Sequence, residues 1–259
     1  MVLKLIKHEF KYLGRYLLLI WTGLLLMIVS QRFLVELRDS DIMLLEIAAG
    51  MAVPVLIFSL IAMHLVTFVV VILRFYQNMF TGEGYLTFTL PVKIWQIIFS
   101  KLLVGFVIML VPLAVTIAVG LSFLNISQFT EIVIEGIRYY WQSGYSLITL
   151  VLIGLTMLIG MIIQIVDFYL AMSFGQLANR NKVVFSIISY IGIYTVKQLV
   201  STVLMAGLFM SGYLESLNDK FLPGTINGLM GLTLLMTTAL LVLEWLLVNY
   251  LCKNKLNLE

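Results

Sequence analysis

The sequence predicts an all-α integral membrane protein, with six transmembrane helices in a single transmembrane domain over residues 1–259. The first observation is composition: 62% of the residues are hydrophobic and 11% are charged, against roughly a quarter charged in soluble domains. The second is that the apolar residues form continuous runs of about 20 residues, which is the length a helix needs to cross a bilayer. Because helices satisfy their own backbone polar groups in lipid, such runs favour helices over the alternating pattern of a barrel.

The chain begins with a basic stretch, and residues 1–15 are predicted to form an amphipathic helix on the inner membrane surface. One stripe at helical spacing is apolar, and a second stripe is basic. The apolar stripe holds Leu3, Ile6, Phe10, Leu13 and Leu17, and the basic stripe holds Lys4, Lys7, Lys11 and Arg15. Such a helix places its cations against anionic lipid headgroups, so membrane lipid is an expected partner. The alternative is a basic flank that only sets topology.

Six spans follow, over residues 16–35, 49–73, 102–123, 146–178, 183–211 and 225–251. Pro54 lies in the first turns of the second span, and Pro112 predicts a kink in the third. A tight turn over residues 179–182 separates the fourth span from the fifth. No small-residue cleavage site follows the first span, which is therefore predicted to be retained.

The distribution of Lys and Arg predicts that both termini are cytoplasmic, in a multi-pass protein of the plasma membrane. Short cytoplasmic loops carry an excess of these cations. The inner side receives eleven, namely Lys4, Lys7, Lys11, Arg15, Arg74, Lys93, Lys101, Arg180, Lys182, Lys253 and Lys255. The outer side receives four, namely Arg32, Arg38, Arg138 and Lys220. An even number of spans agrees with two termini on one side.

The longest predicted cytoplasmic loop runs over residues 74–101, and its centre reads FTGEGYLTFTLPV. Gly82 and Gly84 bracket Glu83 and allow backbone conformations closed to other residues. Apolar groups follow at Tyr85, Leu86, Phe88 and Leu90, before Pro91 ends the segment. Exposed apolar groups on a short cytosolic segment need a cover. We expect either a partner protein or lipid, and the alternative is a re-entrant loop covered by the chain itself.

A surface helix is also predicted on the outer side, over residues 124–145. Its apolar and aromatic residues fall on one side and its charged residues elsewhere, and its aromatic residues suit the membrane interface. The apolar side holds Ile126, Phe129, Ile132, Val133, Ile137, Tyr140 and Trp141. The alternative is an irregular loop.

Several motifs are absent from the sequence. There is no P-loop, no H-E-x-x-H and no G-x-S-x-G. The only cysteine is Cys252, which leaves no intramolecular disulfide and no cysteine cluster for a metal. The only histidines are His8 and His64. We therefore predict no catalytic residues, no metal site and no nucleic-acid partner.

The basic start KLIKHEFKYLGRYLLL leads into the six spans, and FYQNMFTGEGYLTFTLPVKIWQIIFSKLL follows the second. In these features the chain resembles the type-2 transmembrane permease subunits of bacterial ATP-binding cassette (ABC) exporters. The resemblance implies that the loop forms a coupling helix against a separate cytosolic ABC ATPase. It also implies that this ATPase binds ATP and Mg²⁺, that this chain binds no cofactor, and that a second permease subunit completes a homodimer or heterodimer. The ATPase-coupling residues would be Gly82, Glu83, Gly84, Tyr85, Leu86, Phe88, Leu90 and Pro91.

Polar groups within the spans are functional candidates because they are costly in a bilayer. These are His64, Gln164, Asp167, Lys197 and Glu244. At about 1.5 Å per residue, Asp167 lies about 16 Å and Lys197 about 21 Å from the cytoplasmic ends of their spans. An ion pair between them is therefore predicted, with Glu244 nearer the cytosol. The pair is either structural or part of a translocation pathway, and His64 is expected to be a neutral, hydrogen-bonded interior histidine.

The predicted function is export of hydrophobic or amphipathic molecules, such as peptides, toxins, drugs or lipids. Sparse charge within the spans disfavours a highly polar cargo. The first alternative is an ion- or proton-coupled secondary transporter or channel that uses the intramembrane charges. The second is a membrane anchor that recruits a cytosolic partner.

Overall fold

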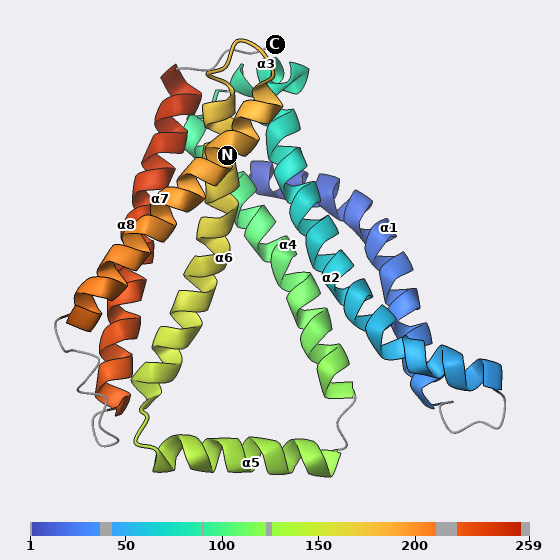
Figure 1. The fold of residues 1–259 in the computed structure, drawn as a ribbon. Helices are drawn as coiled ribbons and strands as arrows, with labels where there is room; N and C mark the ends of the chain where they lie inside the picture. The colour runs from blue at the N-terminus through green and yellow to red at the C-terminus, as the bar shows by residue number, and fades with distance from the viewer. Residues whose placement is uncertain (1, 37–42, 90, 123–125, 211–221, 255–259) are drawn as a thin grey trace. The chain divides into compact units, whose positions relative to one another are not determined.

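The computed structural model describes residues 2–36, 43–89, 91–122, 126–210 and 222–254. Within these ranges all regular secondary structure is helical. The helices are α1 (Val2–Glu36), α2 (Met43–Phe80), α3 (Gly82–Phe88), α4 (Ile94–Ser122), α5 (Ile126–Gln142), α6 (Leu147–Gly175), α7 (Lys182–Met210) and α8 (Leu222–Asn254) (Figure 1). All but α3 and α5 are long and apolar enough to cross a membrane. The prediction of six candidate spans in an all-helical protein is therefore confirmed.

The predicted span boundaries differ most around the loop over residues 74–101. Helix α2 continues to Phe80 and α4 begins at Ile94, so helix extends into this segment from both sides. Neither extension contains glycine or proline, the residues that most often end helices. The short helix α3 lies between these two ends.

The first helix also differs from its prediction. Residues 2–36 form one continuous helix, whereas a surface helix followed by a separate span was expected. Leu13 and Leu17 are buried in a core, and Ile6 and Phe10 pack against the same core. Much of the apolar stripe expected to lie in the membrane interface therefore contacts protein, although Leu3 is exposed.

The chain forms two compact units, which we describe separately. Unit 1 comprises Met1–Gln77 and Gln96–Phe123, and unit 2 comprises Asn78–Trp95 and Leu124–Glu259. The core of unit 1 joins residues of α1, α2 and α4. In this core the Trp21 indole donates a hydrogen bond of 2.9 Å to Thr67 Oγ1, which itself donates 2.7 Å to the Met63 carbonyl. The indole is thus satisfied within an apolar interior, as buried polar groups require.

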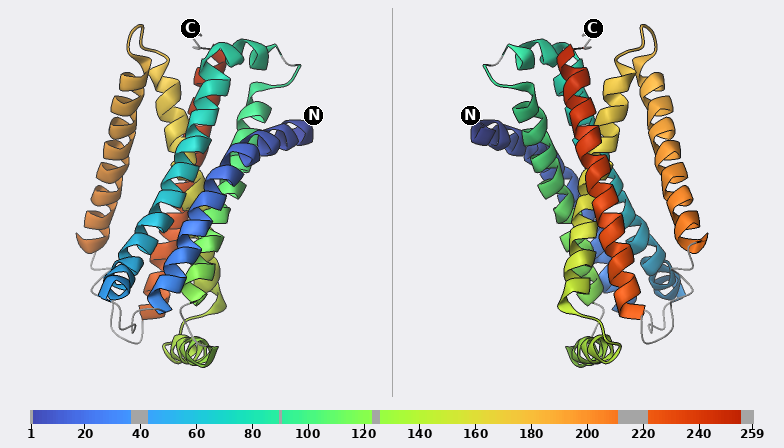
Figure 2. Two further views of the ribbon diagram at one scale, coloured as in Figure 1. Left: turned by 90° about the vertical axis from the view of Figure 1, so that its right-hand side faces the viewer. Right: turned by 90° about the vertical axis from the view of Figure 1, so that its left-hand side faces the viewer.

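In unit 2, α6 packs against both α7 and α8. Figure 2 shows α6 and α8 running side by side, whereas α6 and α7 diverge from the turn that joins them. At this turn Asn181 has φ of 58°, and asparagine is one of the few residues that tolerate a left-handed backbone. The tight turn predicted over residues 179–182 is consistent with this geometry.

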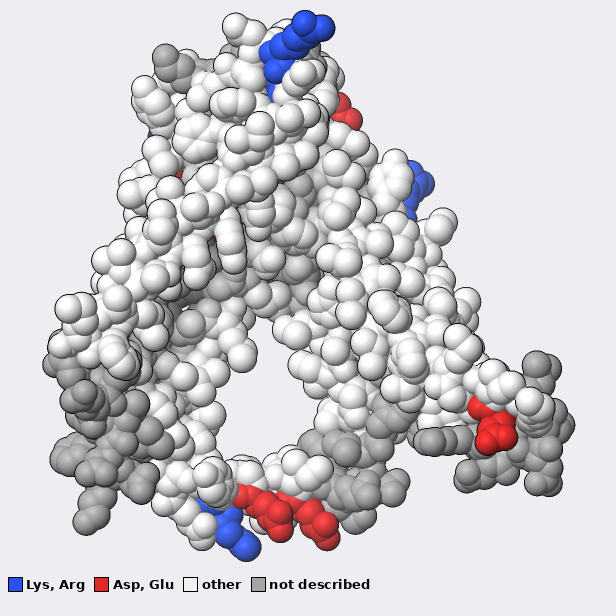
Figure 3. All heavy atoms as spheres, viewed as in Figure 1, with Lys and Arg blue, Asp and Glu red and all other residues white. Residues whose placement is uncertain are grey.

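A helix is also present where an outer surface helix was predicted. Helix α5 spans Ile126–Gln142 and runs across the end of α6 (Figure 1). The connection uses Gly144 at φ of 77°, and the Tyr140 hydroxyl donates a 2.5 Å hydrogen bond to the Ser146 carbonyl. Acidic side chains gather over α5 on the face shown in Figure 3, where most of the long-helix surface is uncharged.

Candidate functional site: an intramembrane charge cluster beside an apolar groove

Three charged side chains meet between the long helices of unit 2. Asp167 comes from α6, Lys197 from α7 and Glu244 from α8. Lys197 Nζ forms ion pairs with Asp167 Oδ1 and with Glu244 Oε1, the latter at 2.5 Å. We call these three residues the charge cluster. It ties the three helices together, because one ammonium contacts a carboxylate on each neighbouring helix.

The pairing of Asp167 with Lys197 confirms the prediction made from their depths in the two spans. Glu244 was predicted only to lie nearer the cytosol than this pair, and its contact with Lys197 was not predicted. Measured from the observed helix ends at about 1.5 Å per residue, Glu244 lies about 15 Å from the end of α8 and Asp167 about 12 Å from the end of α6. A long lysine side chain then reaches both carboxylates.

The charge cluster holds more acceptors than it can satisfy. It contains two carboxylates and one ammonium, so its formal charge is −1 when all three groups are ionised. Glu244 is buried, and its Oε2 has no hydrogen-bond partner among the described residues. Buried charges are costly unless they are paired and hydrogen-bonded, so the Glu244 carboxylate is only partly compensated.

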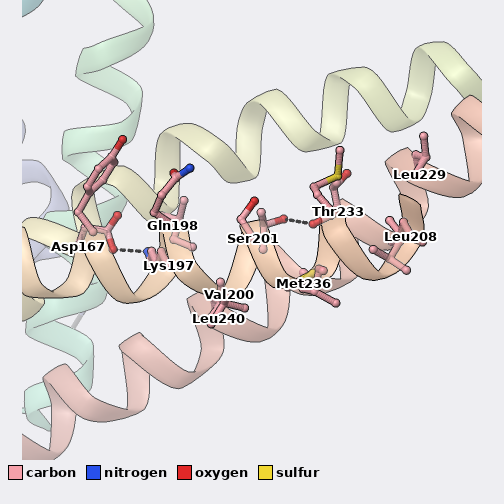
Figure 4. Close-up of a pocket in the computed structure, with 16 residues that line it drawn as sticks. Asp167, Lys197, Gln198, Val200, Ser201, Leu208, Leu229, Thr233, Met236 and Leu240 are labelled. Carbon is pink, nitrogen blue, oxygen red and sulfur yellow. Dashed lines mark hydrogen bonds and ion pairs between the residues drawn. The ribbon is translucent and has the colours of Figure 1, made fainter. Parts of the chain in front are cut away.

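A groove of about 480 Å³ extends from the charge cluster between α6, α7 and α8. Asp167 and Lys197 lie at one end of it, and Leu208 and Leu229 lie towards the other (Figure 4). Its walls are mainly aliphatic side chains and methionines, interrupted by hydroxyl groups. The hydroxyls are those of Tyr194, Ser201, Thr233 and Thr237, and Thr237 donates a 2.8 Å hydrogen bond to the Thr233 carbonyl. We call this feature the α6–α8 groove. Its volume lies within the roughly 300–1,000 Å³ range of small-molecule sites.

Two of the predicted intramembrane residues do not join this site. Gln164 is exposed on α6 and does not line the groove. His64 belongs to unit 1, where its Nδ1 lies 2.9 Å from the Leu60 carbonyl oxygen of its own helix. This contact agrees with the predicted hydrogen-bonded interior histidine.

The predicted coupling segment corresponds to α3 and its flanks. Thr87 Oγ1 lies 3.0 Å from the Asn78 carbonyl oxygen, and Asn78 Nδ2 donates a 3.2 Å hydrogen bond to Glu83. These bonds hold α3 against the end of α2. Tyr85 and Leu86 remain 53% and 73% exposed.

The other predicted coupling residues differ in how far they are exposed to solvent. Gly84 is buried, Phe88 is half-buried, Pro91 is exposed, and Leu90 lies outside the described residues. Gly82 and Gly84 were expected to allow backbone conformations closed to other residues, but the structure does not use that freedom. Both lie inside α3, and Gly144 is the only glycine at positive φ among the described residues.

Unit 1 contains a second group of paired charges, which was not predicted from the sequence. Glu9 on α1 forms ion pairs with Arg74 on α2, at 3.2 Å, and with Lys101 on α4. The Arg74 guanidinium also lies over the Tyr12 ring, 3.6 Å from its centroid. A signal was present in the sequence, because Glu9 is the only acidic residue among the first 35. Arg74 and Lys101 were interpreted only as topology-setting cations.

The predicted membrane-surface cations of α1 are all exposed, namely Lys4, Lys7, Lys11 and Arg15. Lys11 and Arg15 line a shallow depression of about 340 Å³, together with His8, Tyr12 and Tyr16. These five residues share one helical face, since they are three or four positions apart. Their exposure is compatible with contacts to lipid headgroups.

No family model, curated protein or solved structure matches this chain.

Proposed function

We propose that this chain is the transmembrane permease subunit of an ATP-driven ABC exporter. In this proposal the chain moves hydrophobic or amphipathic molecules out of the cell, and a separate cytosolic ATPase binds ATP and Mg²⁺. Three features support it: six candidate spans, the FTGEGYLTFTLPV motif after the second span, and a substrate-sized groove beside buried charges.

The observation that carries the proposal is the position and surface of α3. This seven-residue helix lies between two candidate spans and is fixed to the end of α2 by polar contacts. Its exposed residues Tyr85 and Leu86 are apolar groups that a partner would cover. Docking into a groove on the ATPase would bury them and would transmit the movement of the ATPase to α2 and α4.

The proposed assembly contains two six-span subunits, as a homodimer or heterodimer, and two ATPase subunits. Closure of the ATPases on ATP would move the two copies of α3 and switch the bundles from inward-facing to outward-facing. The chain itself would contribute no catalytic residues to ATP hydrolysis. Both termini and α3 lie on the cytoplasmic side in this proposal.

Affinity purification from the native membrane tests the proposal directly. We expect a P-loop ATPase to copurify with the tagged full-length chain, and we expect its hydrolysis rate to depend on the chain. Purification of the chain without any nucleotide-hydrolysing protein, under conditions that preserve other membrane complexes, would contradict it.

Leu86→Glu is expected to uncouple ATP hydrolysis from transport while the chain still inserts in the membrane. The substitution places a charge on the side chain that is 73% exposed and that the ATPase would bury. Burying an unpaired carboxylate costs several kcal/mol, so we expect roughly a 100-fold loss of ATPase affinity or more. Quantitative copurification measures it. Leu86→Met is the matched control, because it keeps an apolar side chain of similar volume.

One observation favours a second candidate function, an ion-coupled secondary transporter. The charge cluster contains one more carboxylate than cations, and such groups form proton and ion sites in carriers. Purified chain reconstituted in liposomes would then accumulate substrate on an imposed proton gradient without any ATPase. Transport that requires ATP and the partner subunit would exclude this candidate.

A further inference from the structure

We propose that the α6–α8 groove binds an amphipathic cation. The apolar part of the ligand lies along the groove, and its single ammonium or guanidinium group contacts Asp167. As a statement about exported cargo this rests on the proposed function, but the binding itself does not require an ATPase.

The charge balance of the cluster is the first argument. Lys197 is shared between Asp167 and Glu244, so two carboxylates divide one cation. Asp167 lines the groove, whereas Glu244 is not part of the lining. An incoming cation would pair with Asp167 and leave Lys197 with Glu244. Each carboxylate would then have one cationic partner, and the buried charges would sum to zero.

The shape of the groove is the second argument. It is a single cavity of about 480 Å³ that runs from the charged end towards Leu208 and Leu229 (Figure 4). Leu204, Leu232 and Met236 provide apolar walls between these ends. A molecule with one charged end and one apolar chain matches this arrangement. A methionine side chain also adapts its shape to different chains, because it is unbranched and flexible.

The charged groups at the end of the groove disfavour anionic and neutral ligands. An anion would meet Lys197 only in the presence of two carboxylates, which already occupy that ammonium. A neutral ligand would leave the cluster with its unbalanced charge. The ring of Tyr194 also lines the groove and offers a face that attracts cations. A cationic head group therefore complements the charge of this site better than a neutral or an anionic one.

The test uses the full-length wild-type chain in nanodiscs of zwitterionic lipid. The probe is a ten-carbon primary amine that carries a photoreactive diazirine at its apolar end, and labelled peptides are identified by mass spectrometry. We expect labelling of α7 and α8 within residues 194–208 and 229–240. Unlabelled decylammonium should compete roughly tenfold better than decanol, and decanoate should compete least.

Substitutions then locate the binding site. Asp167→Asn leaves Lys197 paired with Glu244 and should weaken competition by decylammonium roughly tenfold, to the level of decanol. Leu232→Trp fills the groove and should abolish the labelling of both segments. Leu235→Trp is the matched control on the same helix, because Leu235 is exposed and does not line the groove.

Competition by decylammonium, decanol and decanoate is compared on the wild-type chain. The result therefore does not depend on the correct folding of a variant. Equal competition by decylammonium, decanol and decanoate would overturn the proposal, as would labelling confined to other segments. Failure here leaves the exporter proposal standing, because that proposal is tested by copurification with an ATPase. Binding of the amine in nanodiscs, together with purification of the chain from its native membrane without any ATPase, would instead retain this site and contradict the exporter proposal.

Discussion

Lys197 is the residue on which the charge cluster depends. It pairs with a carboxylate on each of two other helices, so its removal leaves two acids facing each other. Removal of one acid has a different result, since the other acid keeps its cation. The two kinds of substitution should therefore differ greatly in their effect on stability.

We predict that Lys197→Met destabilises the protein by about 3–5 kcal/mol, because it leaves the buried carboxylate of Glu244 and the half-buried carboxylate of Asp167 without a cation. Asp167→Asn should cost much less, because it leaves one neutral pair between Lys197 and Glu244. Denaturation in mixed micelles, followed by circular dichroism, measures both. The double variant Asp167→Asn with Lys197→Met should fall between the two.

Equal losses from Lys197→Met and Asp167→Asn, or losses that simply add in the double variant, would show that the cluster is not energetically coupled. Gln164→Leu is a suitable control for polarity in α6, because Gln164 is exposed and outside the groove. It should change the stability little.

At the scale of the helices, α6 and α7 approach each other closely at Gly175, the last residue of α6. A methyl group added there would lie 1.8 Å from Ser186 Oγ and 2.8 Å from the Lys182 carbonyl oxygen, both on α7. The turn between α6 and α7 therefore requires a glycine for space rather than for its backbone conformation. This contact sets how closely the two helices approach at the end from which they diverge.

We predict that Gly175→Ala destabilises the protein by about 1–3 kcal/mol, as overpacking usually does. Gly160→Ala, on the same helix, has open space around the added methyl group. It should be neutral or stabilise by roughly 0.5–1 kcal/mol, because alanine favours the helix. Thermal unfolding of the two purified variants compares them directly, and equal midpoints would contradict the packing argument.

Element positions could be predicted from the sequence where one physical signal dominates. Long apolar runs identified all six spans, and the helical spacing of apolar residues placed a helix over most of residues 124–145. The continuity of α1 was missed because its apolar stripe fits either a membrane surface or a protein core. The backbone conformation of Gly82 and Gly84 could not be predicted, because glycine is compatible with a turn and with the short helix that forms there.

The candidate site could be predicted only in part, for a related reason. Depth along a span paired Asp167 with Lys197, but depth alone did not show that Glu244 also contacts Lys197. The groove was not predicted at all. Its volume depends on how α6, α7 and α8 pack, and side-chain order along one helix does not determine that packing.

At the scale of the whole molecule, each unit contains one charged side chain that pairs with two side chains of the opposite charge on two other helices. The sign of the shared charge differs between the units. In unit 1 one carboxylate, Glu9, contacts the cations of Arg74 and Lys101 on two other helices. In unit 2 one cation contacts two carboxylates. Each of these groups of charges joins three long helices.

We predict that α3 faces the cytosol and α5 faces the exterior. The test starts from Cys252→Ala, which removes the only cysteine, a buried thiol near Ser173. Thr89→Cys and Gly136→Cys then place one exposed thiol next to α3 or on α5. An impermeant maleimide should label intact cells that carry Gly136→Cys, and should label Thr89→Cys only after lysis. The reverse pattern would contradict the orientation and with it the docking of an ATPase on α3.

The three-way contact of Glu9 also constrains how the protein is made. Its partners Arg74 and Lys101 lie 65 and 92 residues further along the chain. During synthesis the Glu9 carboxylate gains its first partner only once α2 has been made, and its second only at the start of α4. The three-way contact in unit 1 is therefore completed only after α3, which precedes α4 in the chain, has been synthesised.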